Sequence, residues 1–292
     1  MKKASILFSV FLLLFSFCAC TQSTQDYDIL TTTKPVYDFT RQLCSGTNLS
    51  VGILISEQVS CLHDYTLQVT QMRAIEAADT IVISGAGLEN FMQELFPEPS
   101  QIIDASANIK LFCSDAHDHI EHEDHHHAQD PHIWMSIDNA RKMAQNIFDG
   151  LLQKYPQYKS VFQKNLDILS DEFDTLDELV VSELSSLSHD KLITFHDGFA
   201  YFANYLDLHI LKAIEEEPGS ETSALELKEI IQLVEENQLP AIFTEVNGSN
   251  SAAKIIANET GANIFVLSTC MSHNDYFSAM RNNIYTIKEA LG

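Results

Sequence analysis

The sequence predicts an α/β protein of two strand-helix lobes, each built on a central sheet, that are bridged by one long rigid helix. Three observations lead to this fold class. Short apolar runs alternate with helical patterns in both halves of the chain, one long amphipathic segment separates the halves, and three histidines lie beside predicted strand ends or helix starts. Strands and helices packed in layers are the stable solution for such a pattern. Because ligands of such sheets bind beyond the carboxyl ends of the strands, we expect a binding cleft between the lobes.

The first half of the chain is predicted to form the N-terminal lobe, residues 28–155. Short apolar runs predict strands over residues 27–33, 49–56, 80–84 and, more weakly, 102–105. Helical spacing predicts helices over residues 69–78, 88–95 and 137–154. The strands therefore alternate with helices, which favours a parallel sheet covered by helices.

The long amphipathic segment predicts a linking helix over residues 156–188. Its apolar side chains recur at steps of three or four along one helical face. These residues are Phe162, Leu166, Leu169, Phe173, Leu176, Val180, Leu184 and Leu187. A continuous helix of this length is stiff, so we expect only small movements between the lobes.

The strand-helix alternation resumes in the predicted C-terminal lobe, residues 189–292. We predict strands over residues 191–195, 209–214, 241–244 and 263–267. We predict helices over residues 199–206 and 223–236, and a further helix after each of the last two strands. The second half thus repeats the plan of the first.

The N-terminus predicts an exported lipoprotein. Residues 1–19 combine two lysines with a short apolar run, which is typical of a secretory signal and too short for a transmembrane span. The run ends in Phe17-Cys18-Ala19-Cys20, which resembles a bacterial lipobox. The small Ala19 favours Cys20 over Cys18 as the lipidated residue, with residues 20–27 as a linker. We therefore expect an extracytoplasmic protein that a lipid anchors to the bacterial cell membrane.

Charge and cysteine content narrow the classes of partner. Removing the first nineteen residues, which carry two lysines and no acid, lowers the net charge from −24 to −26. This balance argues against nucleic acid and favours attraction of cations. Export permits disulfides, and Cys44 with Cys61 is a candidate pair because both flank one short predicted strand, although the connectivity stays open. The chain has no CxxC spacing, which argues against a thiolate zinc cluster.

A histidine-rich run covers residues 115–129 and is predicted to be a disordered loop that gathers metal weakly. Its imidazoles belong to His117, His119, His122, His125, His126 and His127. Residues 122–126 read HEDHH and match the metalloprotease pattern HExxH. That chemistry needs a buried helix with both histidines on one face, and this run has no apolar periodicity to bury one. We therefore interpret the match as a consequence of composition.

Four motifs in order along the mature chain carry a family resemblance, with the histidine-rich run between the first two. They are CLHDYTL (61–67) followed by AIEAADTIVISGAGLENFM (74–92), DPHIWMS (130–136), FHDGFAYF (195–202) and FTE (243–245). The chain resembles the zinc and manganese solute-binding lipoproteins of bacterial ABC importers. The resemblance implies two α/β lobes bridged by a rigid helix, a metal held between them, and an ABC permease as partner. We expect a monomer.

The resemblance implies three metal ligands, His63, His132 and His196. A histidine in the last of these places is similar to zinc-type members, whereas manganese-type members tend to place a carboxylate there. We therefore expect Zn²⁺ rather than Mn²⁺. Relatives often supply a fourth ligand where this chain has Leu62 or Ser268.

The fourth place of a tetrahedral site stays open at this point. The alternatives are water, a histidine of the histidine-rich run, Cys270 or His273, of which we favour the first two. Asp64 and Asp197 each follow a ligand histidine and are expected either to orient the imidazole or to cap a loop.

The function that these expectations favour is capture of zinc between the lobes and its delivery to a permease, without catalysis. A manganese receptor of the same type and a metal-dependent surface adhesin are the alternatives of related kind. A zinc hydrolase is the alternative of another class, and it would need a general base, for which Glu245 is the nominee. We interpret Glu245 instead as the structural end of a strand.

Overall fold

The computed structural model of the chain describes residues 27–56, 62, 65–96, 98–112, 129–214, 222–246, 250–272 and 274–292. The expected signal sequence with Cys20, the ligand candidate His63, the histidine-rich run with its six histidines, and His273 lie outside these residues. Among the helices of the described ranges, none combines the length and the hydropathy needed to cross a membrane.

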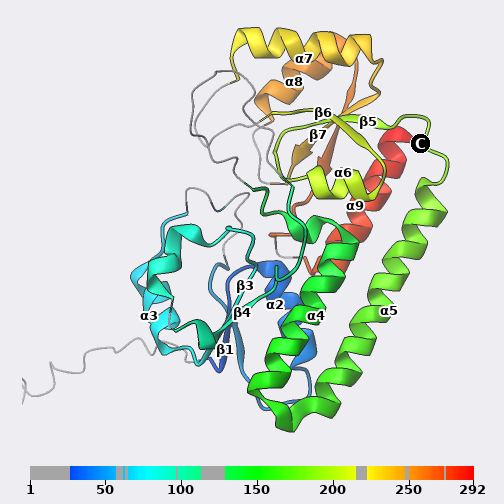
Figure 1. The fold of residues 1–292 in the computed structure, drawn as a ribbon. Coiled ribbons are helices and arrows are strands. Elements are labelled where there is room, and N and C mark those ends of the chain that lie inside the picture. Colours follow the sequence, from blue (N-terminus) through cyan, green and yellow to red (C-terminus); the bar gives the residue numbers. More distant parts are fainter. Residues whose placement is uncertain are drawn as a thin grey trace, which may run out of the picture.

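Two parallel four-stranded sheets form the centres of two lobes, as the sequence predicts (Figure 1). The N-terminal sheet has the order β2-β1-β3-β4, with β1 (Ile29–Thr31), β2 (Val51–Ile53), β3 (Thr80–Ile83) and β4 (Ile102–Asp104). The C-terminal sheet has the order β6-β5-β7-β8, with β5 (Lys191–Thr194), β6 (His209–Ala213), β7 (Ala241–Glu245) and β8 (Asn263–Leu267). In each lobe the connections leave the two central strands in opposite directions, which is where open α/β sheets bind ligands.

Helices cover both sheets, and the longest helix, α5, runs along one side of the molecule (Figure 1). The α-helices are α2 (Lys34–Leu43), α3 (Val69–Ala77), α4 (Ile137–Lys154), α5 (Lys159–Leu184), α6 (Ala200–Tyr205), α7 (Ala224–Glu236), α8 (Ser251–Thr260) and α9 (Tyr276–Leu291). The short 3-10 helices are η2 (Asn90–Leu95), η3 (Pro99–Gln101), η4 (Ile133–Met135) and η5 (Pro156–Tyr158). The periodic apolar face of α5 is buried at Phe162, Leu169, Phe173 and Leu176, which explains why the repeat in the sequence marks one helix.

Helix α2 is the one long element that the sequence analysis does not predict. Pro35 lies in its first turn, where a missing N–H costs nothing. Its buried face carries Val36, Phe39 and Leu43 at helical spacing, and the polar Asp38 and Thr40 are buried as well. Asp38 accepts hydrogen bonds from Lys34 Nζ (2.6 Å) and from the backbone N–H of Tyr276 (3.0 Å), the first residue of α9. This polar contact fastens the start of α9 to the N-terminal lobe.

Both cysteines of the described residues are free and buried, namely Cys44 and Cys270. The candidate disulfide between Cys44 and Cys61 is therefore not formed in this structure, and Cys61 itself lies outside the described residues. Burial raises the pKa of the Cys44 thiol to about 12. Such a thiol is an inert core residue rather than a reactive one.

A buried carboxyl, that of Glu89, lies at the carboxyl end of the N-terminal sheet between the two central strands. Its Oε1 accepts hydrogen bonds from Thr32 Oγ1 (2.6 Å) and the Ser84 N–H (2.7 Å), and its Oε2 accepts one from the Gly85 N–H (3.0 Å). Glu89 thus ties the end of β1 to the end of β3. Burial raises its pKa from 4.5 to about 7, against the effect of these donors.

This pKa predicts that the free energy of unfolding falls as the pH rises from about 4.5 to about 7. Over this range the folded state keeps the Glu89 proton and the unfolded chain releases it, so higher pH favours unfolding. The expected loss is on the order of 3 kcal/mol. Urea unfolding at several pH values should show that Glu89→Gln removes this part of the slope. Equal slopes in the wild type and the variant would contradict the prediction, with the exposed Glu229→Gln as control.

Candidate metal centre

His132 is held by a carboxylate at the start of η4. Asp130 Oδ1 accepts hydrogen bonds from the backbone N–H of His132 (2.9 Å) and from its ring Nδ1 (2.8 Å). Both residues are buried, with 4% of His132 and 5% of Asp130 exposed. Because a carboxylate can only accept, Nδ1 carries the proton and the lone pair of the neutral ring is on Nε2. The Asp130 contact therefore prepares Nε2 to bind a metal.

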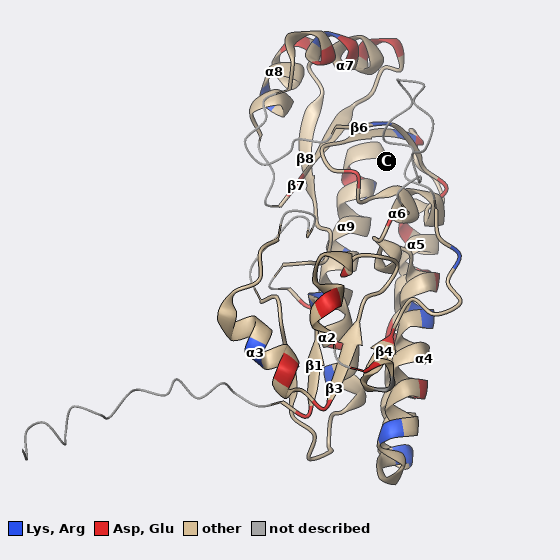
Figure 2. Ribbon diagram, turned by 60° about the vertical axis from the view of Figure 1, so that its left-hand side comes forward, with Lys and Arg blue, Asp and Glu red and all other residues tan. Residues whose placement is uncertain are grey.

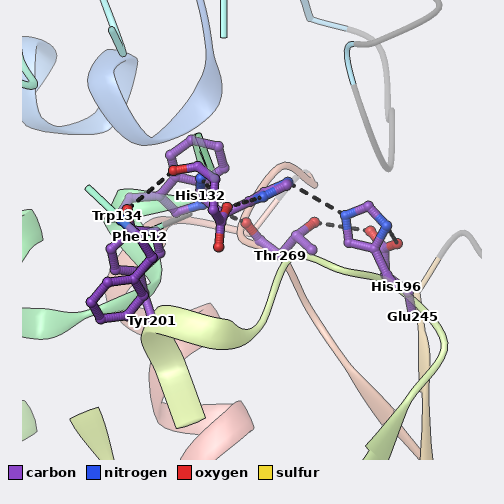
Figure 3. Close-up of polar contacts among 8 residues, drawn as sticks. Phe112, His132, Trp134, His196, Tyr201, Glu245 and Thr269 are labelled. Atoms are coloured by element: carbon purple, nitrogen blue, oxygen red, sulfur yellow. Dashed lines mark hydrogen bonds and ion pairs between the residues drawn. The ribbon is translucent and has the colours of Figure 1, made fainter. Parts of the chain in front are cut away.

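His196 reaches the same point from the C-terminal lobe, two residues after the end of β5. Its Nε2 lies 3.4 Å from Nε2 of His132, and the two ring planes are perpendicular (Figure 3). Two nitrogens bound to one tetrahedral zinc at about 2.05 Å are roughly 3.3–3.4 Å apart. A hydrogen bond between the rings would be shorter, near 2.9–3.0 Å. The separation of the two Nε2 atoms therefore matches one edge of a zinc coordination tetrahedron.

The structure brings together two of the three predicted ligands. His132 and His196 meet between the lobes, whereas His63 lies outside the described residues and stays a prediction. Within the described ranges no group of three or more His, Cys, Asp or Glu residues is arranged to hold a metal ion. The described pair alone therefore does not make a zinc site, which needs at least one further ligand.

Of the candidates for the fourth zinc ligand, the structure argues against Cys270. Cys270 is fully buried, has a left-handed backbone (φ 61°) and directs its Sγ toward the Ser268 carbonyl at 4.0 Å. Burial raises the pKa of its thiol far above the ordinary value. Among the described groups it does not join the two histidines in a cluster. Water and the histidine-rich run remain as predictions, and His273 lies outside the described residues.

Glu245, which the sequence predicts as the structural end of a strand, also contacts the ring of His196. It ends β7, as predicted, and is buried with 4% exposed. Its Oε2 lies 3.8 Å from Nδ1 of His196, and its Oε1 accepts a hydrogen bond from Thr269 Oγ1 (2.9 Å). Strands β5 and β7 are neighbours at the centre of the sheet, so their carboxyl ends place His196 and Glu245 side by side.

The loop that carries His132 is hydrogen-bonded to the C-terminal lobe on both sides of the histidine (Figure 3). Before it, Tyr201 Oη donates to the Asp130 carbonyl (3.1 Å). After it, Trp134 Nε1 donates to the Thr269 carbonyl (2.7 Å), and Tyr276 Oη donates to the Trp134 carbonyl (2.8 Å). Trp134 is buried, with 1% exposed, so it serves packing as well as joining the lobes through its N–H. These bonds fix His132 against the C-terminal lobe.

Gly198 has no side chain, and this leaves room for the imidazole rings of His196 and His132. A Cβ at this position would lie 2.5 Å from Cδ2 and 2.7 Å from Nε2 of His196, and 3.2 Å from Cδ2 of His132. An alanine at this position would therefore force the His196 ring to move, because the ring lies too close to the Gly198 backbone to leave room for a Cβ.

Gly198→Ala is therefore expected to weaken zinc binding by about tenfold to a hundredfold, the range seen when ligand-supporting groups are lost. Thermal unfolding of the metal-free protein should change little, since the displaced atoms belong to one partly exposed ring. Chelator competition measures the first effect and circular dichroism the second. Zinc affinity equal to that of the wild type would contradict the prediction.

Comparison with known proteins gives consistent matches over almost the whole chain. Residues 29–290 match the family described as zinc-uptake complex component A, periplasmic. The chain is 30% identical to zinc-binding lipoprotein AdcA of Streptococcus pneumoniae, a match that covers 99% of this chain and 61% of that protein. The chain thus spans about three-fifths of the length of its streptococcal AdcA relatives.

Solved structures show the same architecture. A crystal structure of ZnuA superposes with a TM-score of 0.80 at 26% identity, covering 92% of this chain and 100% of that one. The Zn(II)-bound ZnuA-like domain of AdcA from Streptococcus pneumoniae gives a TM-score of 0.77 at 27% identity, with 91% and 99% covered. The predicted fold class is confirmed by these neighbours.

Proposed function

Since the chain belongs to the family of periplasmic zinc-uptake complex component A proteins, we propose that it is an extracytoplasmic receptor that captures Zn²⁺ between its lobes. It then delivers the ion to the permease of an ABC importer, and it acts without catalysis. The observation that supports this most directly is the 3.4 Å separation of the His132 and His196 Nε2 atoms, one from each lobe. A cation bound by both rings crosslinks the lobes, which is how a receptor of this shape retains its cargo.

The proposed ligand set is His63, His132 and His196. Three neutral imidazoles suit zinc, whereas carboxylates and water suit manganese better. His132 already has the proton on Nδ1, where Asp130 accepts it, so its Nε2 is available to the metal without rearrangement. A water or a histidine of the histidine-rich run completes the tetrahedron. The hydrolase alternative would instead assign Glu245 to a substrate water, but its contact is with the ring of His196.

We place the protein outside the cytoplasm, lipid-anchored at Cys20, as a monomer. The histidines of residues 115–129 serve as an accessory site that gathers zinc loosely. The net charge of −24 favours cations near the surface, and acidic residues occur in both lobes, for example along α7 (Figure 2). Lysine and arginine are too few to make a nucleic-acid surface.

The test is a calorimetric titration of zinc, with manganese as comparator, into residues 21–292 lacking 115–129. We expect one tight zinc site and much weaker binding of manganese. A tight manganese site with weak zinc would favour the manganese receptor. The absence of any tight site would contradict the three-histidine receptor and would favour the adhesin, or a site that borrows ligands from the deleted run.

A further inference from the structure

Glu245 lies on the side of the His196 ring that faces away from His132. Nε2 of His196 is directed at His132 (3.4 Å), while Nδ1 is directed at Glu245 Oε2 (3.8 Å) (Figure 3). The carboxylate is buried, with 3% of its side chain exposed, so water screens its charge poorly. The distance exceeds a hydrogen bond and marks an electrostatic contact. Glu245 therefore acts on His196 from behind and does not occupy a ligand position beside Nε2.

The chemistry of a metal-bound imidazole requires an acceptor at this place. A neutral ring that gives its Nε2 lone pair to zinc must carry its proton on Nδ1. A carboxylate that accepts this proton fixes the tautomer and the ring orientation and raises the basicity of the ligand. Asp130 makes this contact with His132 at 2.8 Å. Among the ion pairs of the described residues, the carboxylate that contacts Nδ1 of His196 is that of Glu245.

Thr269 links Glu245 to the other lobe. The hydroxyl of Thr269 donates to Glu245 Oε1 (2.9 Å), while its carbonyl accepts from Trp134 Nε1 (2.7 Å). Trp134 lies two positions after His132, on the same loop. The contacts therefore form a closed ring from His132 along the chain to Trp134, then through Thr269, Glu245 and His196 back to His132. Only a docked pair of lobes closes this ring.

We propose that Glu245 is a positioning residue that orients His196 for zinc through Nδ1, and that Thr269 couples this orientation to docking of the N-terminal lobe at Trp134. The inference rests on the proposed function. Zinc bound by both histidines holds the lobes together, and docked lobes in turn hold Glu245 in the place that makes His196 a good ligand. Opening the lobes breaks the Trp134 contact and weakens one ligand of the departing ion.

The test compares matched variants of residues 21–292 with the histidine-rich run retained. Glu245→Gln removes the charge, Thr269→Val removes the hydroxyl at equal volume, and Thr269→Ser keeps the hydroxyl. Glu229→Gln is the control, with the same charge change at an exposed carboxylate of the same lobe. By chelator competition, zinc affinity should fall about tenfold to a hundredfold in Glu245→Gln, less in Thr269→Val, and little in Thr269→Ser or the control.

The second readout is the protonation of each ring nitrogen, followed by long-range ¹H–¹⁵N NMR of the histidine rings. In the zinc-loaded wild type we expect His196 to carry its proton on Nδ1. In metal-free Glu245→Gln the ring signals of His196 should shift while those of His132 stay. A merely structural role of Glu245 would lower affinity without moving the tautomer of His196, and that result overturns the proposal.

The outcomes separate the two levels of inference. If the wild type binds no zinc tightly, the proposed function fails. If the wild type binds tightly and Glu245→Gln binds equally well, only the positioning role fails. Should Glu245→Gln not fold, the Thr269 pair still decides. Weaker zinc binding in Thr269→Val than in Thr269→Ser supports the proposal, whereas equal affinity in Thr269→Val and the wild type, or zinc on Nδ1 of His196, overturns it.

Discussion

Replacing His132 by alanine is expected to weaken zinc binding by about a thousandfold. Zinc held by three or four protein ligands in a folded site is stabilised by on the order of 10–16 kcal/mol. One ligand therefore contributes roughly 4 kcal/mol, and each 1.4 kcal/mol is about a tenfold change in Kd. His132 is the better ordered of the two described histidines, because Asp130 fixes its ring at 2.8 Å. Chelator competition on residues 21–292 lacking 115–129 measures the loss.

The same change removes the ring that compensates the Asp130 carboxylate. Asp130 Oδ2 already has no hydrogen-bond partner within the part of the chain that the structure describes. We therefore also expect a lower Tm of the metal-free variant, since a buried charge is left with less compensation. The exposed His209→Ala serves as control for loss of an imidazole. If zinc raises the Tm of His132→Ala as much as that of the wild type, His132 is not a ligand.

Replacing Trp134 by alanine is expected to cost about 3–5 kcal/mol of unfolding free energy. Trp134 is 1% exposed, so its removal leaves a large cavity. It also removes the N–H that bonds the Thr269 carbonyl across the lobes at 2.7 Å. Urea unfolding of the metal-free protein measures the change, and zinc affinity should fall with it because the loop of His132 loses its anchor.

A matched series separates packing from the hydrogen bond. Trp134→Phe keeps much of the apolar volume and removes the donor, so a loss of about 1–3 kcal/mol is expected. Phe91→Ala is the control, because Phe91 is 39% exposed and its loss should cost far less. A cost below about 1 kcal/mol for Trp134→Ala would show that the lobes do not depend on this contact.

Most of the fold follows from local patterns. The eight strands lie within or next to predicted runs, because buried parallel strands are short, apolar and bounded by turn residues. Helix α5 follows from its long repeat. Helix α2 is not predicted, because it is short and its buried Asp38 looks like a surface residue in the sequence; that burial is explained by Tyr276 of α9, far away in the chain. Buried polar residues are where sequence periodicity misleads.

The meeting of His132 and His196 was predictable from sequence, because they lie in motifs beside a helix start and a strand end. Asp64 lies outside the described residues, and the role of Asp197 stays a prediction. The ion-pair contacts of the two rings with Asp130 and Glu245 were not predicted. Glu245 meets His196 only because β5 pairs with β7, and strand pairing is a long-range property that one sequence does not display.

Phe112 and Asp130, which flank the histidine-rich run, are held together at the start of the His132 loop. The Asp130 N–H donates to the Phe112 carbonyl (3.1 Å), and Tyr201 Oη bonds to both residues while its ring stacks on Phe112 at 4.3 Å. The two ends of the segment between Phe112 and Asp130 are therefore held together by these contacts. Doubling a loop with fixed ends costs only about 0.6 kcal/mol. We therefore expect insertions and deletions between Phe112 and Asp130 to leave the geometry of the metal centre unchanged.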